Sequence, residues 1–260
     1  MRINEFNLGH CVIIMLIILL ASCSTLPKTG PETEPPMRQY KDLVNEKKEY
    51  AVEVSDPLEG FNRGVYRFNY YFDKYLFLPV VKGYAWITPD FLEDGITNFF
   101  KNLREITNLT NSILQFKGKS MAKTTGRIVI NTTLGIGGLF DPATHFGIHR
   151  VNEDFGQTLG FYGVGHGPYL VLPILGPSNV RDTTGLVVDT VVYTVMINEL
   201  VDQADMKDSE EDLLKNGLTV LSAIDTRHRT PFRYYGTGSP FEYDLVRMLY
   251  TLQREFLIAE

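Results

Sequence analysis

The sequence predicts an all-α fold for residues 56–260, and three observations support that prediction. Two motifs are typical of helix starts, Asp56-Pro57-Leu58-Glu59 and Ser239-Pro240-Phe241-Glu242, because each joins a cap residue to a proline and a glutamate. Apolar residues recur at helical spacing after both motifs. The regular apolar–polar alternation of membrane β-barrel strands is missing from the sequence.

The first half of this body contains four predicted helical segments. The first has Asp56 as its N-cap and an apolar face, most of which we expect to pack in the core, made of Phe61, Val65, Phe68, Phe72 and Leu76. A second is expected to begin in the same way at Thr88-Pro89-Asp90-Phe91. Residues 102–116 and 118–134 form a further predicted pair, which ends at four residues rich in glycine, 135–138.

The second half is predicted to be helical as well. Residues 187–200 are a buried or membrane-facing segment whose many valines leave helix and strand both open. Residues 210–227 are amphipathic. The motif at Ser239 opens a final helix, whose apolar face carries Leu245, Met248, Leu249, Leu252 and Phe256.

The amino terminus resembles a bacterial lipoprotein signal. Residues 11–20 form an apolar run of ten residues, which is too short to span a bilayer but suits a secretory signal. Leu20-Ala21-Ser22-Cys23 follows at the right distance and resembles a lipobox, in which the cysteine is acylated. By resemblance to lipoprotein sorting rules, Ser24 directs the protein to the outer membrane. We therefore predict a signal peptide over 1–22 and a lipid anchor on Cys23; an ordinary signal peptide is the alternative.

Residues 23–55 read as an acylated terminus and tether, since they hold four prolines followed by a charged stretch. Residues 56–260 are predicted to form one domain. Cys11 leaves with the signal and Cys23 carries lipid, so no disulfide is expected. The net charge of −6 argues against nucleic acid as a partner and against polybasic lipid binding.

A run of 26 residues, 155–180, carries no formal charge. Its six glycines and three prolines exclude a membrane-spanning helix, and irregular apolar backbone at membrane depth must be buried in protein or line a cavity. We therefore predict a mobile loop or hairpin beside a lipid path; tight turns in a packed loop are the alternative. The predicted path residues are Gly160, Phe161, Tyr162, Gly163, Gly165, Gly167 and Tyr169, with Asn62, Arg63, Phe68 and Asn69 as a second wall.

Aromatic residues are also clustered between positions 66 and 86. Tyrosine and tryptophan at this density form either an interfacial belt at a membrane or ordinary packing, and the lipobox favours the belt. The six residues concerned are Tyr66, Tyr70, Tyr71, Tyr75, Tyr84 and Trp86.

Three ordered motifs resemble one known family. They are 56–63 (Asp-Pro-Leu-Glu-Gly-Phe-Asn-Arg) with Phe68-Asn69, 131–141 (Asn-Thr-Thr-Leu-Gly-Ile-Gly-Gly-Leu-Phe-Asp), and 154–182, which contains Gly163-Val164-Gly165-His166-Gly167-Pro168 and Arg181-Asp182. On these residues the chain resembles the MlaA (VacJ) family of outer-membrane lipoproteins over roughly 56–250.

That resemblance implies a single ring-shaped helical domain in the inner leaflet of the outer membrane, with a central amphipathic channel facing the periplasm. Through it, phospholipid misplaced in the outer leaflet would pass towards the periplasm. Family members bind trimeric porins and hand lipid to a soluble periplasmic shuttle (MlaC-like). The direction is thought to be retrograde, although it has been argued over.

An enzyme, most plausibly a lipase, is one rival interpretation, and a scaffold lipoprotein is another. Ser178 lacks the second glycine of Gly-x-Ser-x-Gly. His145 and His149 have the spacing of helical metal ligands, but Gly147 lies between them. Asp154 and Asp182 make no convincing catalytic pair, and Asp182 is expected to cap or pin the next segment. The sequence therefore predicts no catalytic site, metal or cofactor.

Overall fold

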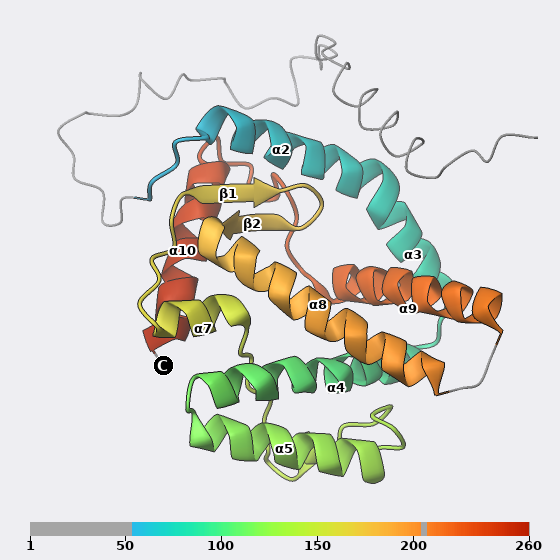
Figure 1. Cartoon of the computed structure of the whole chain (residues 1–260). Helices are drawn as coiled ribbons and strands as arrows, with labels where there is room; N and C mark the ends of the chain where they lie inside the picture. Colours follow the sequence, from blue (N-terminus) through green and yellow to red (C-terminus); the bar gives the residue numbers. More distant parts are fainter. Residues whose placement is uncertain (1–53, 204–206, 260) are drawn as a thin grey trace, which may run out of the picture. The chain divides into compact units, whose positions relative to one another are not determined.

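Helices make up most of the described chain, with one short hairpin among them (Figure 1). The computed structural model describes residues 54–203 and 207–259. The predicted signal peptide, Cys23 and nearly all of the predicted tether therefore lie outside the described residues. The predicted all-α fold is confirmed.

The first half of the body is a series of long helices. Helix α2 continues through a π-helical turn, η2, into α3, and the chain then reverses into α4 and α5. Their bounds are α2 Glu59–Phe72, η2 Asp73–Phe77, α3 Leu78–Ile87, α4 Asp90–Leu114 and α5 Gly118–Thr133. Helix α4 is continuous where the sequence predicted a break near residue 100, because its polar face stays buried along most of its length.

The second half places a hairpin between helices. Two short helices lead to an antiparallel pair, in which Tyr169 lies opposite Asn179 and Leu172 lies opposite Gly176. Three long helices follow, and the valine-rich segment belongs to the first of them. The bounds are α6 Pro142–His145, α7 Phe155–Phe161, β1 Tyr169–Leu172, β2 Gly176–Asn179, α8 Val180–Asp202, α9 Asp208–Arg229 and α10 Glu242–Ala259.

The hairpin lies where the amino-terminal and carboxy-terminal helices meet. Strand β1 contacts α2, while β2 contacts α8 and α10. Helix α7 packs against α8 and α10, and α4 lies beside α5 (Figure 1). Segments that are more than 100 residues apart in the sequence thus converge on the hairpin.

Neither of the two predicted helix starts is capped as the sequence predicted, because other partners bind the carboxylates of Asp56 and Glu242. Helix α2 begins at Glu59, and the Asp56 carboxylate instead accepts hydrogen bonds from Asn62, Tyr243 and Arg247. Helix α10 begins at Glu242, whose carboxylate accepts hydrogen bonds from side chains and backbone at positions 66, 235 and 237 rather than from residue 239.

The interior is rich in polar side chains, and many large hydrophobic side chains lie on the outside. Among the described residues, buried polar or charged side chains outnumber buried hydrophobic ones by more than two to one. The apolar face of α2 was predicted to pack in the core, but Phe61 is 61% exposed and Leu76 55% exposed, while Asn62 and Asn69 are buried. In α10, Phe256 is 73% exposed. This inverts the distribution that is usual for water-soluble proteins.

The polar interior is held together by hydrogen bonds and ion pairs. Arg127 of α5 is fully buried and donates to Glu105 of α4, to Asp141 and to the carbonyl oxygen of Ile148. Hydrogen bonding on this scale is what makes buried polar groups tolerable. A small apolar cluster joins strand β1 to α2 and α10 and consists of Tyr66, Tyr169, Val171 and Tyr243.

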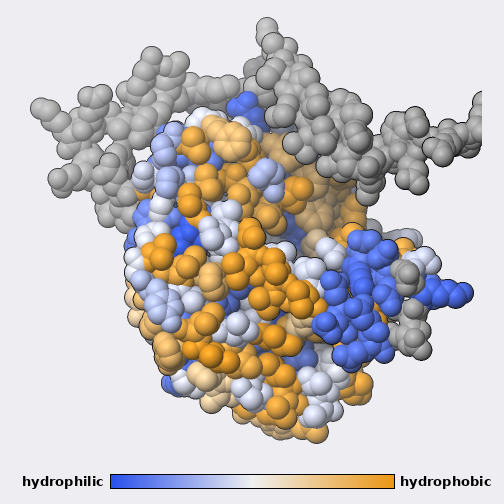
Figure 2. Space-filling view, viewed as in Figure 1, coloured by the Kyte–Doolittle hydropathy of each residue, from blue (hydrophilic) through white to orange (hydrophobic). Residues whose placement is uncertain are grey.

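Hydrophobic residues cover much of the outer surface (Figure 2). Helix α8 is long and apolar enough to cross a membrane by length and composition, and only 17% of its most apolar window is buried. The predicted aromatic belt is divided: Tyr66 and Tyr84 are buried, whereas Trp86 is 86% and Tyr75 68% exposed. Apolar surface of this extent marks a face that contacts lipid or another protein.

Candidate functional site

Two asparagines of α2 fix the hairpin in place. The Asn62 amide donates to the Tyr169 carbonyl (3.0 Å) and accepts from the Val171 N–H (2.9 Å). Asn69, two turns later, donates to the Leu172 carbonyl and accepts from the Ile174 N–H. These bonds satisfy the edge of β1 that does not face β2. They also hold Ile174 in a left-handed conformation (φ 68°) that is unfavourable for a β-branched residue.

A polar stripe on α10 faces the hairpin from the other side. Its members follow one another at intervals of four, three and four residues, so they lie on one helical face. Arg247 pairs with Asp56. Arg254 donates to both oxygens of Asp154 (2.6 and 2.7 Å) and also to Asp182 (2.9 Å). The four members are Tyr243, Arg247, Tyr250 and Arg254.

Arg254 keeps its two carboxylate partners ionised. Burial raises the pKa of Asp154, but hydrogen bonds and charge attraction from Arg254 outweigh burial and leave that pKa below its usual value. Asp182 also accepts from Asn179, Arg181 and Tyr250. These two carboxylates thus join α10 to the residues that begin α7 and α8.

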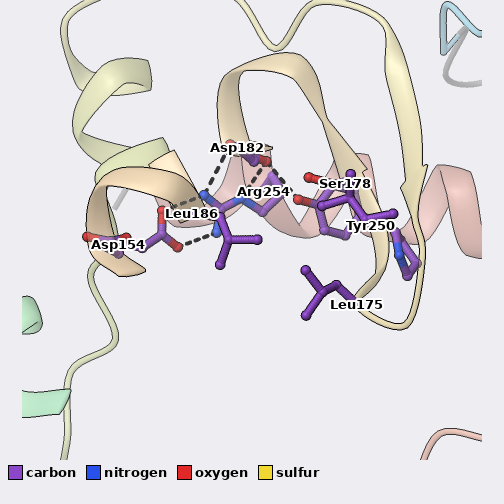
Figure 3. Close-up of a pocket in the computed structure, with 10 residues that line it drawn as sticks. Asp154, Leu175, Ser178, Asp182, Leu186, Tyr250 and Arg254 are labelled. Atoms are coloured by element: carbon purple, nitrogen blue, oxygen red, sulfur yellow. Dashed lines mark hydrogen bonds and ion pairs between the residues drawn. The ribbon is translucent and has the colours of Figure 1, made fainter. Parts of the chain in front are cut away.

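A cavity of about 270 Å³ adjoins this ion cluster (Figure 3). Charged and hydroxyl groups form one part of its lining, and leucine and proline side chains form the other. Arg254 lies between Asp154 and Asp182 in the close-up, and Leu175 projects from the hairpin turn. The lining consists of Asp154, Leu172, Leu175, Pro177, Ser178, Asp182, Leu186, Asp189, Tyr250 and Arg254.

The apolar lining of the cavity continues onto the outer surface of α8. Leu175 is 67% exposed and Leu186 40% exposed, so both belong to the cavity and to the surface. Val187, Val191 and Val195 extend the same surface along the helix, each more than half exposed. The cavity is thus a recess of mixed polar and apolar lining beside an apolar face, an arrangement that suits an amphipathic ligand.

The loop at 162–168 connects α7 to the hairpin and is tied at both ends. Tyr162 donates its hydroxyl to the Leu114 carbonyl (2.7 Å), and the Arg181 N–H donates to the His166 carbonyl. Gly163 has a φ of 84°, so glycine is favoured there. A Cβ on Gly165 would meet nothing within 4 Å. The middle of the loop therefore lies at the surface with open space beside it.

The structure divides the predicted path residues into two groups. Asn62, Asn69 and Tyr169 are at most 1% exposed and belong to the interior. The predicted path residues between positions 160 and 167 form the second group and lie in α7 or in the loop. Tyr162 is 58% exposed.

Arg63 and Phe68 are placed differently again. Arg63 pairs with Glu59 and Asp244 and lies over the ring of Tyr243. Phe68 is 38% exposed and stacks on its neighbour four residues on. Sequence reasoning missed the α10 stripe altogether; its four-three-four spacing of tyrosine and arginine was the available signal.

Comparisons with known proteins agree on one family. The family described as MlaA lipoprotein matches residues 54–257. A protein of Rickettsia prowazekii is 39% identical over 189 residues, which cover 72% of this chain and 73% of that protein. The intermembrane phospholipid transport system lipoprotein MlaA of Escherichia coli K12 is 40% identical over 139 residues, 52% of this chain and 55% of that protein.

A solved structure agrees with these relatives. It is reported as "Structural basis for maintenance of bacterial outer membrane lipid asymmetry", and its chain is 31% identical. The TM-score is 0.61, with 78% of this chain and 99% of that chain covered. The profile match spans nearly the whole described body and agrees with the predicted resemblance. The chain therefore belongs to the MlaA lipoprotein family.

Proposed function

We propose that this chain is an outer-membrane lipoprotein, anchored through Cys23 in the inner leaflet. It takes phospholipid that is misplaced in the outer leaflet and passes it through an amphipathic channel towards the periplasm. A soluble lipid carrier (MlaC-like) receives the lipid there, and a trimeric porin docks beside the chain. The net direction is retrograde, so the protein maintains lipid asymmetry.

The inverted distribution of side chains carries this proposal. An apolar exterior is favourable against acyl chains, and a polar interior gives headgroups hydrogen-bonding partners away from hydrocarbon. A water-soluble scaffold gains nothing from exposed aromatic and aliphatic side chains on its long helices. Membership of a family whose named relatives belong to an intermembrane phospholipid transport system supports the same conclusion.

The loop at 162–168 is the proposed movable element of the path. It is largely exposed, carries no formal charge, and is followed by the hairpin that lines part of the cavity. Its glycines supply the backbone freedom that movement needs. Asn62 and Asn69 support the path by holding the hairpin, and Tyr162 and Phe161 offer exposed aromatic contact to acyl chains.

A lipase is the alternative that the structure supports less. The Ser178 hydroxyl is buried, and its partners are the Thr183 hydroxyl and a backbone carbonyl, neither of which is a general base. A variant Ser178→Ala that keeps lipid transport would exclude a serine nucleophile.

A reversible disulfide across the loop tests the path. A Cβ built on Gly167 lies 3.2 Å from the Val180 Cβ, so a shift of a few tenths of an ångström brings the pair to the separation of about 3.5–4.5 Å found in disulfides. The sequence has no cysteine in 54–259, so the pair Gly167→Cys and Val180→Cys introduces the only thiols of the body. Transport is measured in cells that lack their own copy of this protein and carry the variant instead. Phospholipid exposed at the cell surface is labelled with an impermeant probe, and the amount labelled reports how much was not transported.

We expect the oxidised variant to leave phospholipid in the outer leaflet and the reduced variant to clear it. The reduced sample is the matched control, because it carries the same substitutions and the same strain at Gly167. Equal clearance in both redox states would overturn the role of the loop. Normal asymmetry in cells with no functional copy at all would overturn the transport function itself.

A further inference from the structure

We propose that the cavity between the hairpin, α7, α8 and α10 binds the ammonium-bearing headgroup of a zwitterionic phospholipid, with Asp189 as its counter-charge. This inference rests on the proposed function and narrows its substrate class. It concerns a preference between headgroups, not the existence of transport.

The charges lining the cavity do not balance. Asp154 and Asp182 are neutralised by Arg254 and by Arg181, which bonds to Asp182 at 2.9 Å. Asp189 is different: it accepts from the Asn111 amide (3.0 Å) and the Phe155 N–H (2.9 Å). Within the described part of the chain, no lysine or arginine lies at ion-pair distance from Asp189. One carboxylate of the lining is therefore left for a cation from outside the chain.

Burial makes the ionised form of the Asp189 carboxylate unfavourable when no cation contacts it. Burial is the main cause that raises the pKa of Asp189 above its ordinary value, and the nearby Asp154 adds to it. The hydrogen bonds from Phe155 and Asn111 and the charge of Arg254 offset this rise only in part. A cation in contact with a partly buried carboxylate stabilises the ionised form. An ammonium group would therefore bind favourably here, whereas a purely anionic headgroup would meet like charge.

The volume of the cavity suits a headgroup rather than a whole lipid. Its volume of about 270 Å³ lies just below the range of about 300–1,000 Å³ that is typical of drug-sized ligands. Ser178 and Tyr250 add hydroxyl groups to the lining. Leu175 and Leu186 lead from the recess to the exposed valines of α8, where acyl chains have an apolar surface to follow. The tails thus remain outside while the headgroup enters.

Competitive lipid retention tests this assignment. Full-length acylated protein is incubated with vesicles holding equal amounts of phosphatidylethanolamine and phosphatidylglycerol with identical acyl chains. The protein is then re-isolated, and mass spectrometry gives the ratio of the two retained lipids. The variants are Asp189→Asn, Asp189→Glu and, as matched control, Glu199→Gln, which removes an exposed charge from the same helix outside the cavity.

We expect the wild type to favour phosphatidylethanolamine by about fivefold. Asp189→Asn should bring the ratio close to one, while Asp189→Glu and Glu199→Gln should keep the preference. Thermal unfolding confirms that each variant is folded, and Asp189→Glu tests the charge separately if Asp189→Asn unfolds. The same measurement with EDTA and with added Mg²⁺ distinguishes a headgroup from a metal cation.

Three results would overturn the inference. They are a ratio that is unchanged in Asp189→Asn, a wild-type preference for phosphatidylglycerol, and a ratio set by Mg²⁺ alone. In each of these cases lipid is still retained, so the proposed function stands. Retention of neither lipid by the wild type would instead overturn the proposed function, and the inference with it.

Discussion

Replacing Asn62 with alanine should detach the hairpin from α2 and destabilise the protein. Two backbone groups lose their partners, the Tyr169 carbonyl and the Val171 N–H, and both residues are 1% exposed, so water cannot easily replace the amide. A buried polar group left without a partner costs about 1–3 kcal/mol. We therefore expect the free energy of unfolding to fall by about 2–5 kcal/mol. The Asp56 carboxylate keeps Tyr243 and Arg247 as donors, so its loss of one bond adds little.

Urea unfolding in a mild detergent, followed by circular dichroism, measures this effect. Asn98→Ala is the matched control, since its amide makes a single exposed hydrogen bond of 3.3 Å to the Leu139 carbonyl, and less than about 1 kcal/mol should be lost. Lipid retained per folded molecule gives a second measurement. A loss in Asn62→Ala no larger than in Asn98→Ala would refute the role of Asn62 in holding the hairpin. An unchanged stability with lost lipid retention would place Asn62 in the path instead.

Three further predictions concern pH, helix contact and the loop. Burial raises the pKa of Asp141, but hydrogen bonds from neighbouring donors, including Arg127, lower it more, from 3.8 to about 2. Its ionised form thus stabilises the fold by about 2 kcal/mol above pH 4, and that contribution should fade as the pH drops towards 2. In urea unfolding, Asp141→Asn should therefore have a lower free energy of unfolding than the wild type at pH 7, and the difference should shrink at pH 3. Gly185→Ala should fail to fold or lose several kcal/mol of its free energy of unfolding, because its Cβ would lie 2.2 Å from the Gly156 nitrogen. Gly217→Ala is the control: its Cβ would meet nothing within 4 Å, so thermal unfolding should show a neutral or slightly stabilising effect. Gly165→Glu should fold normally, since that Cβ also meets nothing, yet clear less surface phospholipid in cells; normal clearance would favour a scaffold.

The helices were largely predictable from the sequence, whereas the burial of their faces was not. Periodicity locates the apolar face of α2 correctly, but it cannot tell whether that face meets a protein core or lipid. Phe61 and Leu76 were assigned to the interior because that is where a water-soluble protein places them. The lipobox pointed the other way, but it lies outside the described residues.

The ends of helices and the site depended on contacts between distant residues. Asp56 has the sequence context of an N-cap, yet partners on α10, some 190 positions away, bind its carboxylate instead. Arg254 likewise pairs with Asp154 and Asp182, which are distant from it in the sequence. The uncharged run at 155–180 did indicate the segment that carries the loop and the hairpin, because glycine and proline exclude a regular helix there.

The most direct test is mass spectrometry of the full-length, acylated protein, purified gently from membranes. Because the polar interior and apolar exterior suit an amphipathic ligand, we predict that phospholipid co-purifies with it, together with a trimeric porin. A folded protein with Cys23 acylated and no phospholipid bound would contradict the account and favour a scaffold.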